Sequence, residues 1–315
     1  CSLPYIMRAA PEEVVSEAIT LNFSTWSLAT IVSGGLINLL SRMETISIGG
    51  DIIVMNEFHY MMVITAISSL SFFLVIFIRE PRPRSTSSHF INHLKALKSD
   101  YDWKLIFRVL TPNMLIAIGA GLTIPFINLF FNSVFTLDSD TFSLIGASTA
   151  GIVFLSALVI PYIRRRYGFK VAILIPQWSA IFFLIILAVT QIASAFSWAL
   201  YVAIAAFMLR QPLMNMAGPV TSELGMKYVG ERNQELISAM SSSIWSASWF
   251  ISAKIFQVLR QWELQYFQIF LITAVMYGVG VIFYHSLIND YMKRDLESEN
   301  PQLPPDEPIQ ALSRQ

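Results

Sequence analysis

The stretch that decides the fold is "SLIGASTAGIVFLSALVIPYIRRRYGFK", residues 143–170. It opens with a long apolar run that holds no charged residue and closes with a turn that carries Arg164, Arg165 and Arg166. A membrane-spanning helix needs about 20 mostly apolar residues, and Lys and Arg collect in cytoplasmic loops. The stretch therefore predicts a transmembrane helix followed by a cytoplasmic loop.

The composition of the whole chain agrees with this prediction. Of 315 residues, 55% are hydrophobic and 13% are charged, whereas soluble domains carry about 25% charged residues. The 21 basic and 21 acidic residues cancel, so nothing favours nucleic acid as a partner. One cysteine and 4 scattered histidines offer no disulfide framework and no metal-ligand spacing. We expect an all-α integral membrane protein in a lipid bilayer, with no cofactor and no metal site.

Working outward from residues 143–170, the chain contains eight apolar runs of spanning length. The polar segment at 79–104 separates two groups of runs and is interpreted as a linker, and the Pro-rich end at 288–315 as a disordered tail. The predicted spans are Leu21–Leu40, Phe58–Ile78, Leu105–Val134, Phe142–Ile163, Val171–Ile192, Phe196–Pro219, Leu236–Leu259 and Tyr266–Leu287.

The basic residues assign the predicted loops to sides of the membrane. Most of them lie in the linker, in the loop after residue 163, in the loop after residue 219 and in the tail, and these segments all fall on one side. The alternate loops hold only Arg42 and Arg260. Because Lys and Arg are retained in the cytoplasm, the linker, the loop at 164–170 and the tail are predicted to be cytoplasmic.

Two segments of the chain repeat one pattern. "PEEVVSEAITLNFSTWSLAT" (residues 11–30) aligns with "GERNQELISAMSSSIWSASW" (residues 230–249), so that Trp26 matches Trp245 and Ser24 matches Ser243. In both, a polar lead-in on the cytoplasmic side enters a spanning helix. A repeat that keeps its orientation across a cytoplasmic linker is a parallel repeat, as found between the halves of one large transporter class.

With this repeat, the sequence resembles the major facilitator superfamily of secondary transporters. "IGAGLTIPFINLFFNSVF" (residues 118–135) resembles the family's seventh helix, and residues 143–170 resemble its eighth helix and the loop that follows. The resemblance implies that residues 1–78 hold the end of helix four with helices five and six, and that 105–287 form the six-helix C-terminal half. The chain would then be truncated at its N-terminus relative to the family's twelve helices.

The family's loop motif, G-x-x-x-D-R-x-G-R-K, has a degraded copy here. Arg166, Gly168 and Lys170 match it and are interpreted as a gating loop, while Pro161, Arg165 and Phe169 replace the Gly, Asp and Arg. A gating ion pair that needs the missing aspartate is therefore not expected.

Arg210 is the first candidate for substrate binding. It lies within an apolar span, where an arginine costs at least about 2.5 kcal/mol, and helical spacing places it on one face with Ala203, Ala206 and Ala217. An alanine stripe indicates either close helix packing or a cavity wall, and the resemblance favours the wall. Snorkelling to the headgroups is the alternative.

The other candidates for a substrate-binding cavity are polar or aromatic residues within the predicted spans. Packing between helices, interfacial anchoring and snorkelling are their alternative roles. They are Asn128, Asn132, Trp26, Trp245, Asn215 and Lys254.

These observations predict a secondary transporter that moves a small solute by alternating access, either uptake or efflux, in the plasma or inner membrane. No Asp or Glu lies inside a predicted span. Basic side chains without acidic partners in the spans favour an anionic or polar solute. The identity of a coupling ion, H+ or Na+, is left open. The alternative is a non-transporting sensor or scaffold with this fold. An intramembrane enzyme would need acid–base pairs or metal ligands inside the spans. The predicted spans show no such arrangement, so we expect no catalytic residues. We also expect a monomer.

Overall fold

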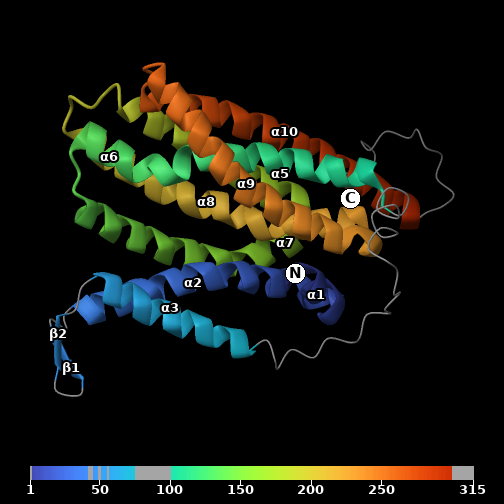
Figure 1. The fold of residues 1–315 in the computed structure, drawn as a ribbon. Coiled ribbons are helices and arrows are strands. Elements are labelled where there is room, and N and C mark those ends of the chain that lie inside the picture. Colours follow the sequence, from blue (N-terminus) through green and yellow to red (C-terminus); the bar gives the residue numbers. More distant parts are fainter. Residues whose placement is uncertain (1, 42–44, 49–50, 55–56, 75–100, 300–315) are drawn as a thin grey trace.

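A computed structural model describes residues 2–41, 45–48, 51–54, 57–74 and 101–299. Long helices dominate it (Figure 1). The helices are α1 (Ser2–Ala9), α2 (Val15–Ser41), α3 (Glu57–Leu74), α5 (Trp103–Thr123), α6 (Ile127–Phe135), α7 (Ser139–Thr190), α8 (Trp198–Val229), α9 (Gln234–Gln261) and α10 (Tyr266–Glu299). Short 3-10 turns η1 (Glu12–Val14), η3 (Ile124–Phe126) and η4 (Glu231–Asn233) join some of them.

The helices form two parts, which we name the N-terminal part (α1–α3) and the C-terminal bundle (α5–α10). In Figure 1, α2 and α3 lie along one side of the molecule, next to α7. Helix α2 packs against α7 and α8, while α5 packs against α9 and α10. The N-terminal part therefore meets the bundle mainly through α2, and α1 adds a smaller contact with α9.

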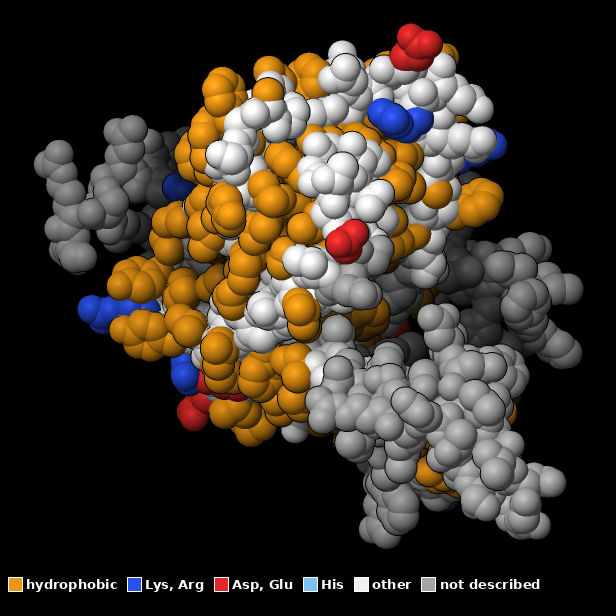
Figure 2. Space-filling view, turned by 90° about the vertical axis from the view of Figure 1, so that its left-hand side faces the viewer, with side chains coloured by type: hydrophobic (Ala, Val, Ile, Leu, Met, Phe, Trp, Pro, Cys, Tyr) orange, Lys and Arg blue, Asp and Glu red, His pale blue; other side chains and the backbone are white. Residues whose placement is uncertain are grey.

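Among the described residues, three helical stretches are long and apolar enough to cross a membrane: Trp103–Phe135, Thr141–Thr190 and Tyr266–Leu296. The second has 50 residues, or about 75 Å of helix at 1.5 Å per residue, more than twice the roughly 30 Å of a hydrocarbon core. It therefore corresponds to the two predicted spans at 142–163 and 171–192. On the face that Figure 2 shows, hydrophobic side chains are widespread and few charged ones lie among them.

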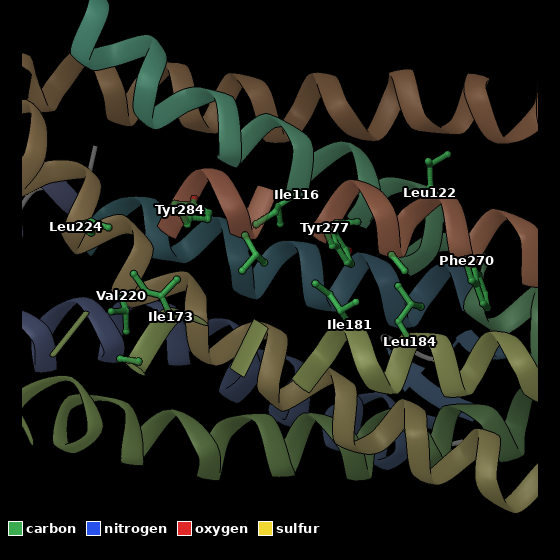
Figure 3. Close-up of a cluster of buried hydrophobic side chains, with 14 of the residues drawn as sticks. Ile116, Leu122, Ile173, Ile181, Leu184, Val220, Leu224, Phe270, Tyr277 and Tyr284 are labelled. Atoms are coloured by element: carbon green, nitrogen blue, oxygen red, sulfur yellow. The ribbon is translucent and has the colours of Figure 1, made fainter. Parts of the chain in front are cut away.

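The C-terminal bundle has a continuous apolar core, part of which is shown in Figure 3. Tyr277 of α10 is 1% exposed and packs against Gly119 of α5, where an added Cβ would lie 2.8 Å from the Tyr277 ring. Gly121 similarly lets Ser252 of α9 approach α5. Glycines at these positions allow α5 to sit close to both α9 and α10.

Three sequence-based expectations differ from the structure. The predicted loop after residue 41 contains an antiparallel hairpin of β1 (Thr45–Ile48) and β2 (Asp51–Val54). The predicted span Leu105–Val134 is interrupted by η3, because Pro125 lacks the N–H of a regular helix. Residues 288–299 continue α10 and are helical rather than disordered, and Asp290 among them pairs with Arg108. Most of the predicted linker and the rest of the tail lie outside the described residues.

Candidate functional site

One end of the molecule gathers most of the described ion pairs, and we call it the basic end. It comprises α1, the starts of α2, α5 and α9, the turn at Gly168 within α7, and the last turns of α8 and α10. In Figure 1, α1 and the end of α10 lie at this end, opposite the hairpin and α6. The four loops predicted to share one side of the membrane contribute to it wherever they are described.

Two ion pairs at the basic end join the N-terminal part to the C-terminal bundle. The Arg165 guanidinium lies 2.7 Å from Glu17 Oε1 at the start of α2. On the other flank, Arg8 of α1 donates a 2.7 Å hydrogen bond to Glu235 in the first turn of α9. The arginine that replaces the family motif's aspartate thus makes an ion pair between the two parts, which does not need the missing aspartate.

A second set of charges lies behind Arg165, within the bundle. Glu223 of α8 is only 3% exposed, and its Oε1 lies 3.2 Å from Arg164 and 3.3 Å from Lys227. The Arg164 guanidinium also lies 3.4 Å above the ring of Phe169. Glu223 Oε2 and Glu17 Oε2 are buried without a hydrogen-bond partner. In both carboxylates, therefore, only one of the two oxygens has a partner.

Asp290 ties the ends of three bundle helices together. It pairs with Arg108 of α5 at 3.0 Å and with Arg294 of α10 at 3.2 Å, and it accepts the hydroxyl of Tyr228 from α8. Burial, together with the hydrogen bond to Asp290, raises the pKa of Tyr228 to about 12. All of these contacts lie within the bundle.

The predicted gating loop is a sharp turn in the middle of α7. Gly168 has φ 74 and ψ −177, a conformation that other residues adopt only with strain. Arg166 and Lys170 on either side are exposed. The glycine of the motif thus lets the helix reverse, and the reversal presents Arg164 and Arg165 to their two glutamates.

Arg210 is fully buried, with 0% of its surface exposed. Its guanidinium donates to Gln211 Oε1 at 3.1 Å and to the hydroxyl of Tyr277 at 3.3 Å, and Nε has no partner. No carboxylate of the described residues pairs with it. The alanines of its stripe are also buried, so this face of α8 is a packing face in this structure and not a cavity wall.

The remaining candidates occupy different places. Trp245 donates its indole N–H to Asn113 Oδ1 of α5 at 3.1 Å, whereas Trp26 is 79% exposed. Asn215 is exposed and bonds the backbone of its own helix. Asn132 donates to the Leu137 carbonyl just beyond the end of α6, Asn128 is exposed, and Lys254 donates to Gln257 near the other end of the bundle.

The structure therefore does not bring all predicted residues to one place. Arg210 adjoins Gln211, Trp245 adjoins Asn113, and Lys254 and Asn132 lie apart from both pairs. The sequence analysis missed Gln211, Asn113 and the glutamates of the basic end. Asn113 and Gln211 had a signal, since each is an amide next to a proline within an apolar run. In the described part of the chain, no group of three His, Cys, Asp or Glu residues is placed to hold a metal ion.

Comparison with known proteins agrees with this architecture. The family model of the Major Facilitator Superfamily matches residues 1–253. The fold is similar to the crystal structure of a bacterial homologue of the iron transporter ferroportin in an outward-facing state, with a TM-score of 0.63 at 15% identity.

That match covers 90% of this chain but 66% of the other chain, so this chain spans slightly less than two thirds of its structural relative. No curated protein matches the sequence. The family match, which extends from α1 into α9, is well over half of the chain. The chain therefore belongs to the Major Facilitator Superfamily.

Proposed function

We propose that this protein is a secondary transporter that moves a small polar or anionic solute by alternating access. The basic end faces the cytoplasm, and the pairs Glu17–Arg165 and Arg8–Glu235 form its gate. The observation that carries the proposal is that these ion pairs cross between the N-terminal part and the C-terminal bundle. Alternating access requires contacts between the halves that form in one state and break in the other.

The character of these contacts suits a gate. Arg8 and Glu235 are both about half exposed or more, and exposed ion pairs contribute only about 0–1 kcal/mol each. Such contacts break at low cost. The contact of Asp290 with Arg108 and Tyr228 stays within the bundle and would move with it. With the gate pairs formed, the cytoplasmic end is closed, in keeping with the outward-facing state named for the similar structure.

The test is the accessibility of one engineered cysteine in the full-length protein. In a Cys1→Ser background, Asn215→Cys places a thiol on the exposed flank of α8. It lies 14 residues from the end of α8 at Val229, or about 20 Å along the helix. Its labelling by a membrane-impermeant thiol reagent is measured from each side of oriented vesicles.

The double variant Glu17→Gln with Glu235→Gln should raise labelling from the cytoplasmic side about fivefold, because losing two pairs of about 0.5 kcal/mol shifts the equilibrium by about 1 kcal/mol. Arg294→Gln is the matched control, since it removes an ion pair at the same end but within the bundle. Labelling that responds equally to both variants, or to neither, would reject the gate. Counterflow of a labelled solute in proteoliposomes then separates a transporter from a sensor, which would bind without exchange.

A further inference from the structure

The turn of α7 carries three consecutive arginines, and two of them are already bound. Arg164 pairs with Glu223 inside the bundle, and Arg165 pairs with Glu17 of α2. The third, Arg166, is exposed and makes no ion pair or hydrogen bond with any described residue. Since both carboxylates that pair with this turn are held by its other arginines, Arg166 is left for a partner outside the chain.

Lys170 is a second cation of the same kind. It lies on the other side of the reversal at Gly168, and it too is exposed and makes no ion pair or hydrogen bond within the described residues. Its neighbour Phe169 is buried and packs its ring against Tyr291 of α10, which fixes the start of the second arm. An unpaired cation on a surface turn is ordinary, so the surroundings decide what Arg166 and Lys170 can bind.

The turn lies at the depth of the lipid headgroups. Gly168 divides the apolar stretch Thr141–Thr190 into two helical arms. Residues 141–167 and 169–190 form these arms, so each is at least about 30 Å long at 1.5 Å per residue. An arm of this length crosses the hydrocarbon core of a bilayer once. A turn between two such arms therefore emerges among the headgroups.

Exposed apolar side chains lead along both arms toward these cations. On the first arm, Leu155, Tyr162 and Arg166 share one face, because steps of seven and four residues return to nearly the same direction on a helix. Leu155 and Tyr162 are exposed, as are Ile175 and Trp178 on the second arm. Acyl chains cover such faces in a bilayer, and Tyr and Trp favour its interface. Arg166 therefore lies where the headgroup of a lipid on this face would be.

We propose that Arg166 and Lys170 bind the phosphate of an anionic phospholipid whose acyl chains lie along the exposed faces of α7. Arg and Lys are the side chains that bind phosphate, and basic sites at the membrane surface select anionic headgroups. A zwitterionic lipid brings its own ammonium, which competes with the two cations for the phosphate. The inference is independent of the proposed transport cycle, because neither residue belongs to the gate pairs.

The test compares phosphatidylglycerol with phosphatidylcholine, two lipids that differ in net charge. The full-length protein is purified in detergent, either lipid is added with the same acyl chains and in the same amounts, and native mass spectrometry measures the lipid bound per protein. Phosphatidylglycerol should bind at lower concentration than phosphatidylcholine. Equal binding of the two lipids would overturn the proposal.

Substitutions locate the binding. Arg166→Gln with Lys170→Gln should weaken the binding of phosphatidylglycerol about 25-fold, because each Lys or Arg near an anionic headgroup surface contributes about fivefold. Lys104→Gln with Lys254→Gln is the charge-matched control, since it removes two exposed cations from α5 and α9, and it should keep the parent's affinity. Arg166→Lys with Lys170→Arg retains both charges and should keep most of the preference.

Three further results would overturn the proposal. The first is a preference for phosphatidylglycerol that survives Arg166→Gln with Lys170→Gln, and the second is an equal loss in the control, which would make net charge the cause. The third is displacement of the lipid by glycerol 3-phosphate at equal concentration, which would indicate a site for a soluble phosphate. Melting temperatures without added lipid should match the parent's, because all four substituted side chains are exposed, and they separate lost binding from lost folding.

Discussion

The two ends of the molecule are held together by different chemistry. At the basic end, the contacts between the N-terminal part and the bundle include ion pairs that are partly exposed. At the opposite end, where α6 meets α7, α8 and α10, the bundle is held by aromatic rings, and Phe130 alone contacts four of them. Exposed ion pairs are weak and depend on salt, whereas buried rings are strong and do not.

In the proposed transport cycle, this difference bears on which parts move. A contact that opens during each cycle has to be weak, and polar groups separate into water without exposing apolar surface. The ring cluster of α6 lies within the C-terminal bundle, where rigidity is an advantage. The following predictions test whether stability resides in the aromatic end and conformational equilibrium in the basic end.

The largest effect is expected from Phe130→Ala. Phe130 is fully buried among Phe131, Phe135, Tyr266 and Phe270, and emptying such a site costs about 3–5 kcal/mol in protein cores. The melting temperature of the full-length protein in detergent should fall sharply. Phe250→Ala, at an 81% exposed position of α9, is the control and should change it little. Equal falls for both variants would show that the ring cluster is not a special source of stability.

An intermediate effect is expected from Gly121→Ala. An added Cβ would lie 2.6 Å from the Cβ and Oγ of Ser252, so α5 and α9 would have to move apart, and overpacking of this kind costs about 1–3 kcal/mol. The variant should lower the melting temperature less than Phe130→Ala does. Gly146→Ala, with nothing within 4 Å of its added Cβ, should leave it unchanged. A neutral Gly121→Ala would mean that the close approach of α5 and α9 is unimportant.

The sequence predicted the elements whose signals are local. Apolar runs of spanning length indicated the helices, and the Arg cluster with Gly168 indicated the turn in α7, because run length and glycine depend on neighbouring residues alone. The hairpin at 45–54 was missed, since the strands are short and follow an apolar span. The helical state of 288–299 was missed as well, and Asp290 in this segment pairs with Arg108, which is far away in the chain.

The candidate site was less predictable for the same reason. Spacing placed Arg210 on an alanine stripe, but α8 is apolar on most sides, so periodicity did not tell the packing face from a cavity face. The partners Glu17 and Arg165 come from different parts of the chain, and no local pattern links them. The hydrogen bonds of Gln211 and Asn113 required the positions of their donors, which only the fold supplies.

The smallest effect, and the sharpest test of the comparison, concerns the charges of the gate. Raising the salt concentration should increase cytoplasmic labelling of the Asn215→Cys thiol modestly, because the Debye length shortens from about 8 Å at physiological salt to about 3 Å at 1 M and the attraction within partly exposed pairs weakens. The melting temperature should hardly change, since the aromatic end is insensitive to salt. The swapped double variant Glu17→Arg with Arg165→Glu restores opposite charges. Its labelling rate should be closer to the parent's than the rate of either single variant is.

The single variants place two like charges where the parent has 2.7 Å between opposite ones, so each should label faster than the parent. If the swap labels as fast as the single variants, the charges at residues 17 and 165 act separately and do not form the gate. If salt lowers the melting temperature as well as raising the labelling, stability also depends on the ion pairs of the basic end and not mainly on the aromatic end. If the swap restores the parent's labelling at an unchanged melting temperature, the ion pair of residues 17 and 165 controls the conformational equilibrium. Only the positions of two partly exposed charges would have been exchanged.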